Sequence, residues 1–150
     1  MSYFSSVLEN TSVTVYELVE RRIRRSRRYV FLRSDFNELG SPSQVGRSLL
    51  RLCKSGRLLK IGHGVYTKAR FNRISNNVMP ASPGGADAVF IAVLRRLNLS
   101  YELTGMTADY MQGKTSQVPA FMEVKLKKRL YRKLIIGKLL YNLNVAHKSK

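Results

Sequence analysis

The sequence has little of the chemistry on which catalytic and metal sites depend. The only cysteine is Cys53, which excludes a disulfide framework and a zinc site built from cysteines. Two histidines, His63 and His147, do not make a metal centre by themselves. The nine Asp and Glu residues contain no pair whose spacing indicates acid–base catalysis. The sequence therefore predicts no metal, no cofactor and no enzymatic activity.

Long apolar runs are also missing. The longest is AVFIAVL at residues 88–94, which is far shorter than the roughly 20 residues that span a bilayer. The first residues, MSYFSSVLENTS, lack the charged-then-apolar order of a signal peptide. We therefore expect a soluble cytoplasmic protein with no membrane partner.

Positive charge is what the chain has in excess. It contains 27 Lys and Arg residues against 9 Asp and Glu, a formal net charge of +18. The excess is spread evenly, because residues 1–78 have a net charge of +10 and residues 79–150 one of +8. Such a balance indicates a polyanionic partner, for which DNA, RNA and an anionic membrane surface are the general candidates. With DNA as the partner, the protein is expected to associate with the nucleoid.

The stretch SPSQVGRSLLRLCKSGRLLKIGHG, residues 41–64, has the pattern of a helix followed by a β-hairpin. Ser41 suits the N-cap, Pro42 the first helical position, and Gly56 the residue just past the helix end. At about 100° per residue the apolar side chains share one face, namely Val45, Leu49, Leu52 and Cys53. The opposite face carries the polar side chains Ser43, Gln44, Arg47, Ser48, Arg51 and Lys54, with Leu50 at the border. The runs RLLKI and VYTKA, joined by Gly-His-Gly, predict the hairpin.

The elements before this stretch complete the order of a winged helix. Helical spacing runs from Val13 to about Arg28, with Ser12 or Thr14 available as the cap. A short strand at Tyr29–Leu32 follows, and then a short helix that Ser34 caps and that stops at Gly40. The sequence thus predicts an α+β protein with an N-terminal winged helix-turn-helix at residues 13–70, preceded by a flexible lead-in at 1–12.

The second half predicts a small α+β region. Residues 71–85 are rich in Asn, Ser, Pro and Gly and are interpreted as a linker. A domain at 86–146 then contains an amphipathic helix at 86–97 and a short helix around 107–111. After Pro119, the runs FMEVKL, KRLYRKLII and KLLYNLNV predict a basic antiparallel sheet, and residues 147–150 a disordered tail.

The signature YVF–SDF–LGS–V–LxRLxKxGxLxKIGxGVY within residues 21–70 resembles the winged-helix domain of AbiE-type antitoxins, the DNA-binding halves of type IV toxin–antitoxin modules. A weaker similarity lies in TG and GKTSQVPA at 104–120, and the whole resemblance extends loosely over 13–143. It implies a sequence-specific repressor, often of its own promoter, that sometimes neutralises a nucleotidyltransferase-like toxin. It places the DNA-reading helix at Pro42–Ser55 and the wing at Leu58–Lys68.

Candidate contacts divide into two groups. The residues expected to contact base edges in the major groove are Gln44, Arg47 and Ser48, since Gln pairs bidentately with adenine and Arg with guanine. Phosphate and wing contacts are assigned to the remaining polar and basic residues of this region, which are Arg25, Arg28, Arg33, Ser34, Ser43, Arg51, Lys54, Lys60, His63, Lys68 and Arg70.

Two other functions stay open at this point. High pI and a basic C-terminal sheet also suit a structural RNA-binding or ribosome-associated protein. Residues 86–146 alternatively form a platform for a toxin or another protein partner. The leading hypothesis is a transcriptional regulator that binds double-stranded DNA, with a cognate toxin and a second copy of the chain as further candidate partners.

Overall fold

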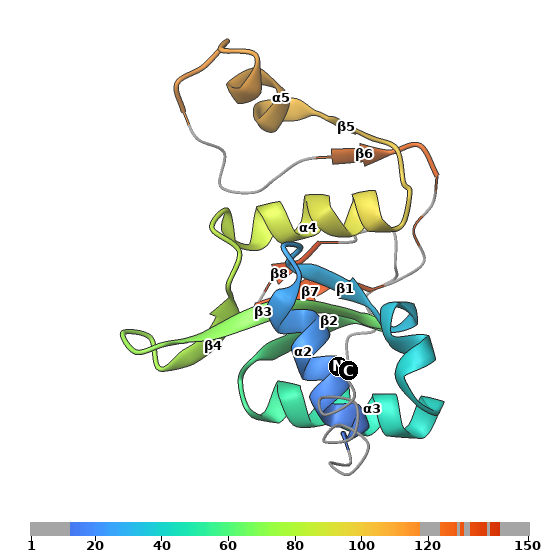
Figure 1. Ribbon diagram of the computed structural model, residues 1–150. Coiled ribbons are helices and arrows are strands. Elements are labelled where there is room, and N and C mark those ends of the chain that lie inside the picture. Colours follow the sequence, from blue (N-terminus) through green and yellow to red (C-terminus); the bar gives the residue numbers. More distant parts are fainter. Residues whose placement is uncertain (1–12, 118–123, 129, 131–132, 138, 142–150) are drawn as a thin grey trace, which may run out of the picture.

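A computed structural model of the chain describes residues 13–117, 124–128, 130, 133–137 and 139–141 (Figure 1). The fold is α+β, as predicted from the sequence. The first half contains α2 (Val15–Arg25), β1 (Val30–Leu32), the 3-10 helix η1 (Arg33–Leu39), α3 (Pro42–Lys54), β2 (Leu58–Gly62), β3 (Val65–Asn72) and β4 (Asn77–Pro80). The second half contains α4 (Gly85–Arg96), β5 (Tyr101–Leu103), α5 (Gly105–Met111), β6 (Val124–Leu126), β7 (Ile135–Ile136) and β8 (Leu139–Leu140).

Local sequence signals determine where α3 begins and ends. The Ser41 hydroxyl accepts a hydrogen bond from the Gln44 N–H at 3.2 Å, and the Gln44 side-chain oxygen accepts one from the Ser41 N–H at 3.0 Å. This reciprocal cap satisfies two backbone donors, and Pro42 at the first position has no N–H to satisfy. Gly56 follows the helix with φ of +79°, a left-handed conformation that favours glycine.

An antiparallel sheet of strand order β1-β3-β2 forms the centre of the molecule. In β1, Val30, Phe31 and Leu32 pair with Thr67, Tyr66 and Val65 of β3. On its other edge, β3 pairs with β2, with a register irregularity between Lys60 and Gly62. The second half of β3 continues beyond this sheet and pairs with β4, so that a two-stranded hairpin projects from the body (Figure 1).

Both faces of this sheet are covered. Phe31, Leu58 and Tyr66 pack on one side against apolar residues of α2, η1 and α3. Val30 and Val65, their neighbours in the strands, point to the opposite side and pack against α4 and the segment around β7. This alternation is the period of two that a β-strand imposes on its side chains. Residues 86–97 therefore share a hydrophobic core with the N-terminal sheet.

Asp35 in η1 joins four elements. One carboxylate oxygen accepts a hydrogen bond from the Leu32 N–H of β1 at 2.9 Å, and the other pairs with the Arg96 guanidinium of α4. Its backbone carbonyl accepts a hydrogen bond from Arg22 of α2 at 2.7 Å. The Asp35 side chain is only 19% exposed, so these charge-assisted contacts are screened little by water.

The structure corrects several expected boundaries in the first half. Helix α2 is shorter than the predicted 13–28 and is capped by Thr14, whose hydroxyl accepts from the Glu17 N–H. Ser34 does not cap the short helix, because the Asp35 carboxylate binds the Leu32 N–H instead. The stretch 71–85 is not all linker, since residues 71–72 belong to β3 and residues 77–80 form β4.

The C-terminal strands also pair differently from the prediction. A single sheet was expected after Pro119, but β6 pairs with β5 and β7 pairs with β8, as two separate two-stranded sheets. The predicted lead-in at 1–12 and tail at 147–150 lie outside the described residues, as do parts of the three predicted strands. No described helix is long and apolar enough to cross a membrane.

Replacing Asp35 with alanine is expected to destabilise the fold by about 2–3 kcal/mol, because it leaves the Leu32 N–H and the Arg96 guanidinium without their shared acceptor. Urea unfolding followed by circular dichroism measures the change. Glu38→Ala is the matched control, since Glu38 lies in the same short helix and makes an exposed ion pair with Arg22. Its unfolding midpoint should barely move. Equal effects of the two substitutions would contradict the role given to Asp35.

Candidate nucleic-acid interface

Helix α3 presents one polar and basic surface to solvent, which we name the α3 face. It consists of the exposed residues Ser43, Gln44, Arg47, Leu50, Arg51 and Lys54. At about 100° per residue these positions span an arc of roughly 120°. Arg47 and Lys54 lie near its middle, one above the other. Their side chains therefore point directly away from the core that Val45, Leu49 and Leu52 fill.

The three predicted base-contacting residues lie in different environments. Arg47 is exposed near the centre of the α3 face. Gln44 is exposed too, but its side-chain oxygen accepts from the Ser41 N–H, so the amide cannot also pair bidentately with adenine while it caps the helix.

Ser48 does not lie on the exposed face, and its predicted placement there is wrong. It is 5% exposed, and its hydroxyl donates to the Gln44 carbonyl at 2.8 Å. The reason is geometric, because Ser48 follows Arg47 by about 100° around the helix, on the side that α2 covers.

On the side toward α2, the α3 face borders a groove. The Arg51 guanidinium lies over the Tyr16 ring, 4.0 Å from its centre, which is a cation–π contact. The groove, of about 430 Å³, runs between residues 13–16 and the α3 residues Gln44, Arg47, Ser48 and Arg51. Tyr16 thus holds Arg51 in place at the edge of the face while the arginine stays exposed.

On the opposite side, two further cations lie beside α3. The Arg33 guanidinium donates to the Pro42 carbonyl at 2.6 Å. It fits because Gly46 has no side chain, since a Cβ there would come within 2.9 Å of the guanidinium. Lys60 of β2 is exposed and lies near Cys53. The α3 face is therefore flanked by positive charge on both sides.

The other predicted phosphate contacts are mostly exposed. This applies to Arg25, Arg28, Ser34, Ser43, Lys54, His63 and Arg70. Lys68 differs, because its ammonium donates to the Ser26 carbonyl at 2.6 Å and lies 5.4 Å from the centre of the Tyr29 ring. It ties β3 to the end of α2, so it is committed to an internal contact.

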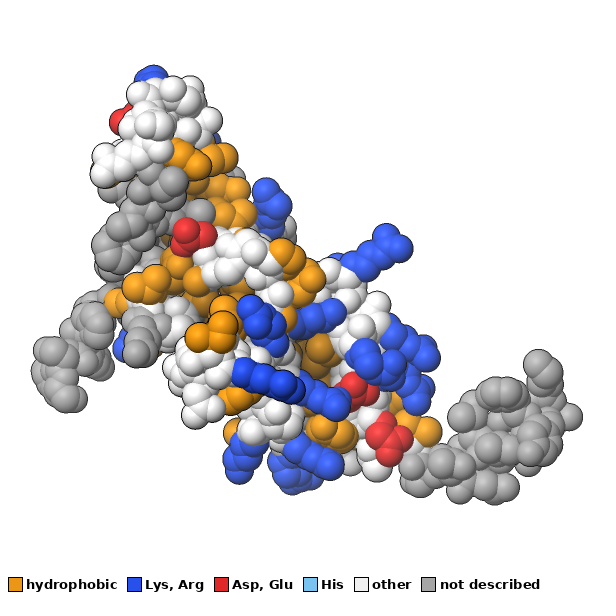
Figure 2. Space-filling view, turned by 90° about the vertical axis from the view of Figure 1, so that its left-hand side faces the viewer, with side chains coloured by type: hydrophobic (Ala, Val, Ile, Leu, Met, Phe, Trp, Pro, Cys, Tyr) orange, Lys and Arg blue, Asp and Glu red, His pale blue; other side chains and the backbone are white. Residues whose placement is uncertain are grey.

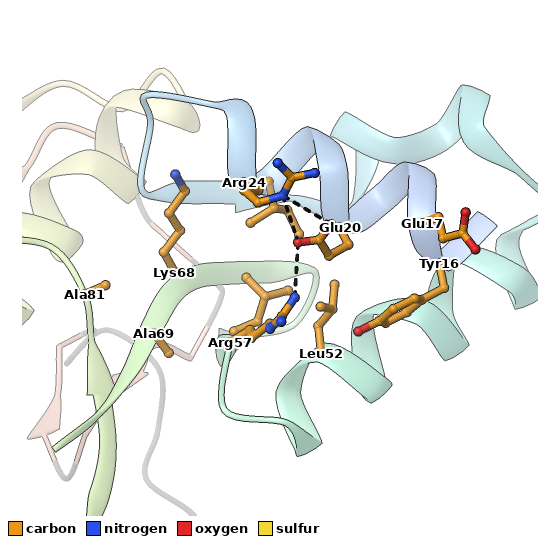
Figure 3. A pocket seen from close by; sticks show the side chains of 11 residues that line it. Tyr16, Glu17, Glu20, Arg24, Leu52, Arg57, Lys68, Ala69 and Ala81 are labelled. Carbon is orange, nitrogen blue, oxygen red and sulfur yellow. Dashed lines mark hydrogen bonds and ion pairs between the residues drawn. The ribbon is translucent and has the colours of Figure 1, made fainter. Parts of the chain in front are cut away.

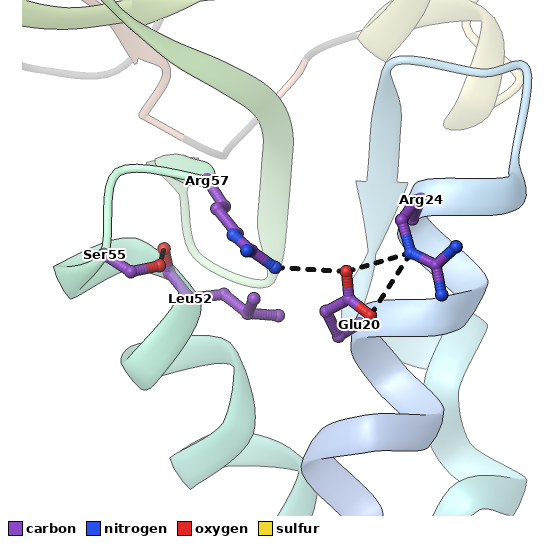
Figure 4. Close-up of polar contacts among 5 residues, drawn as sticks. All are labelled: Glu20, Arg24, Leu52, Ser55 and Arg57. Carbon is purple, nitrogen blue, oxygen red and sulfur yellow. Dashed lines mark hydrogen bonds and ion pairs between the residues drawn. The ribbon is translucent and has the colours of Figure 1, made fainter.

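A second basic concavity lies between α2 and the strands. It is an open pocket of about 660 Å³ whose lining includes the buried residues Ile23, Leu52 and Leu58 (Figure 3). At its wall the Glu20 carboxylate bridges two arginines, with oxygen–nitrogen distances of 3.2 Å to Arg24 and 3.1 Å to Arg57 (Figure 4). Because one carboxylate serves two guanidinium groups, the cluster keeps a net positive charge.

The positive charge of the α3 face is not neutralised by nearby carboxylates. No acidic residue occurs between Glu38 and Asp87, a stretch that contains Arg47, Arg51, Lys54, Arg57, Lys60, Lys68, Arg70 and Arg73. Among the described residues, only Arg57 of these eight makes an ion pair. Figure 2 shows Lys and Arg side chains gathered over the lower part of one face, with few acidic ones among them. Such a surface attracts polyanions.

Sequence reasoning missed two features of this surface. Leu50, which it placed at the border of the helix, is 55% exposed within the α3 face. Residues 71–85 are rich in Asn, Ser, Pro and Gly, which is typical of a linker, yet residues 71–72 belong to β3 and residues 77–80 form β4, paired as a hairpin.

The described residues contain no group of three His, Cys, Asp or Glu side chains that could hold a metal ion. Cys53 is partly buried, and burial raises the pKa of its thiol while nearby Lys60 opposes that shift. A nucleophilic cysteine needs a lowered pKa, so its environment is that of a packing residue.

Comparison with known proteins gives one finding. A family model described as "Family of unknown function (DUF6088)" matches residues 18–147, so the chain belongs to this family. No curated protein and no solved structure gives a significant match.

The raised thiol pKa makes Cys53 a test of the packing behind the α3 face. At pH 8 the folded protein should react more slowly with iodoacetamide than the urea-unfolded chain, because burial disfavours the thiolate. The rate should rise with pH through a midpoint above that of a free thiol, about 8.5. As Cys53 is the only cysteine, the unfolded chain is its own control. Faster reaction in the folded state would contradict this description.

Proposed function

We propose that this member of the DUF6088 family binds double-stranded DNA as a winged helix-turn-helix transcriptional regulator, with α3 in the major groove. The observation that carries the proposal is the α3 face, where Arg47 and Lys54 project from a capped helix into solvent with no carboxylate opposite them. The flanking cations Arg33 and Lys60 enlarge the same surface.

The topology supports a winged helix. Residues 15–72 run helix, strand, short helix, helix, strand, strand, and the sheet order is β1-β3-β2. In that arrangement the helix before the hairpin is the one that enters the groove, and the hairpin turn serves as the wing. The corresponding turn is Gly62–Gly64, with His63 exposed at its tip.

The chemistry of the α3 face suits direct readout of bases. The major groove is about 12 Å wide and admits an α-helix, and Arg pairs bidentately with guanine in it. Arg47 is the residue for this contact. Leu50 suits the thymine methyl group, and Lys54 a phosphate. Ser48 and Lys68 have no part in the proposal, because one is buried and the other is bound within the fold.

Contacts within the fold order Arg33 and Arg51 in the absence of DNA. Arg33 is fixed by the Pro42 carbonyl and Arg51 by the Tyr16 ring. A side chain that is already ordered loses less conformational entropy on binding, so these arginines suit contacts to the DNA backbone that set the orientation of α3. The similarity to AbiE-type antitoxins noted for residues 21–70 supports a role in repression of transcription.

The test is selection of bound duplexes from a randomised DNA library, followed by affinity measurements on the enriched sequence. Enrichment of a defined site, with structured RNA competing poorly at moderate salt, supports the proposal. If no duplex is enriched and structured RNA competes better than any DNA, the proposal is wrong and the RNA-binding function replaces it. Salt dependence alone does not decide, because phosphate contacts release counterions with either nucleic acid.

Arg47→Ala is expected to lower affinity for the selected site by about tenfold to a hundredfold and to relax preference at one base pair, in line with about 1–3 kcal/mol for a bidentate contact. Lys54→Ala should instead weaken all sequences alike and reduce the salt slope by about one unit. Fluorescence anisotropy with the site and with single-base variants measures both effects.

The matched control is Arg95→Ala, because Arg95 is an exposed arginine on α4, away from the α3 face. It should leave sequence preference unchanged. If Arg47→Ala and Arg95→Ala behave alike, α3 does not read the bases.

A further inference from the structure

The β3–β4 hairpin stands out from the body as an arm. Ala69 is the last residue of β3 bonded to the β2 side, through its N–H to the Arg57 carbonyl, and the pairing with β4 then runs to Asn72↔Asn77. At about 3.3 Å per residue the turn lies roughly 10 Å beyond that point. Figure 1 shows this arm projecting past the other elements.

The arm carries apolar side chains where solvent reaches them. Ile74, in the turn, is 97% exposed, and the cross-strand partners Phe71 and Val78 are 53% and 37% exposed. A single exposed apolar residue is ordinary on a protein surface, but three on one short arm indicate a contact site. β-branched residues are also uncommon in turns, where Asn, Gly and Asp dominate.

The turn that holds Ile74 is ordered by its own hydrogen bonds. The Asn72 side-chain oxygen accepts from the Ile74 N–H at 2.9 Å and from the Ser75 N–H at 3.4 Å. Asn76 has φ of +59°, the left-handed conformation that closes the turn. The Ile74 side chain is thus presented on a preorganised tip, which lowers the entropy lost when it is inserted into a partner.

The charges of the arm point to a polyanion as that partner. Residues 69–81 contain Arg70 and Arg73 and no acidic residue. The arm also rises beside the end of α3, because a Cβ on Gly56 would lie 3.5 Å from Val78. A duplex that is bound to the α3 face is therefore within reach of the arm.

We propose that the β3–β4 hairpin is a second DNA contact, in which Ile74 inserts between base pairs from the minor groove and bends the duplex. Arg70 and Arg73 bind the flanking phosphates. Proteins that bind the minor groove use apolar side chains as wedges, and each insertion kinks the DNA by about 20–90°. The inference rests on the proposed DNA binding and adds to it a deformation of the bound duplex.

The experiment measures binding and bending on the same molecules. A duplex containing the selected site carries a fluorescent donor and acceptor at its ends, so that bending shortens the end-to-end distance and raises energy transfer. The wild-type protein should bend the duplex by an angle in the range of about 20–90°. Ile74→Ser should abolish the bend while affinity falls by less than about tenfold, and Ile74→Leu should restore it. Replacing both Arg70 and Arg73 with alanine should lower affinity and reduce the salt slope by about two units, because two phosphate contacts are lost.

Met111→Ser is the control, because Met111 is 66% exposed and lies on α5, away from the arm. It should bend DNA as the wild type does. If the wild-type protein binds its site without bending it, or Ile74→Ser bends it equally, the inference is wrong and the proposed function stands. Failure to bind any duplex overturns both. Loss of binding to anionic vesicles in Ile74→Ser, with DNA bending unchanged, would make the arm a membrane contact instead.

Discussion

The central sheet imposes the constraint from which the rest of the arrangement follows. Its strands are apolar on both faces, since Val30 and Phe31 are adjacent in β1 yet belong to opposite cores. A sheet with two apolar faces has to be covered on both sides to exclude water. Helix α4 covers one face, and α2 with α3 covers the other. α3 is thereby fixed with its apolar side inward and its cations outward.

Three carboxylates of the first half hold these layers together. Glu20 joins α2 to Arg57, the residue before β2. Glu38 pairs with Arg22, and Asp35 connects β1 to α4. The Arg22 guanidinium also lowers the pKa of the Glu38 carboxyl through its hydrogen bond. Glu20, Asp35 and Glu38 each already have an arginine partner, so these three carboxylates are not left to neutralise the α3 face. The same residues that stabilise the fold leave its outer surface positive.

Sequence reasoning succeeds where structure is set locally and fails where it depends on distant partners. The cap at Ser41 and the apolar spacing of α3 are local signals, and both were predicted. Ser48 is buried because α2 packs against that side of α3. The apolar spacing within α3 does not show on which side a neighbouring helix will pack. The sequence predicted Ser34 as the cap of η1. In the structure the Asp35 carboxylate accepts from the Leu32 N–H, and the same carboxylate also pairs with Arg96, which is distant in the sequence. The pairing of β6 with β5 joins residues on either side of 118–123, which no short-range pattern specifies.

In the proposed complex, the helix and the arm differ in what each would recognise on the DNA. In this complex, Arg47 would read donor and acceptor groups that are distinct for every base pair in the major groove. An inserted Ile74 makes no hydrogen bond, so it discriminates only by how easily a base step unstacks. The helix would therefore fix the position on the DNA, and the arm would favour sites where a flexible step lies at the right distance. Because Val78 of the arm lies beside Gly56 at the end of α3, that distance is set by the fold. Two weak preferences at a fixed spacing combine into a stronger one.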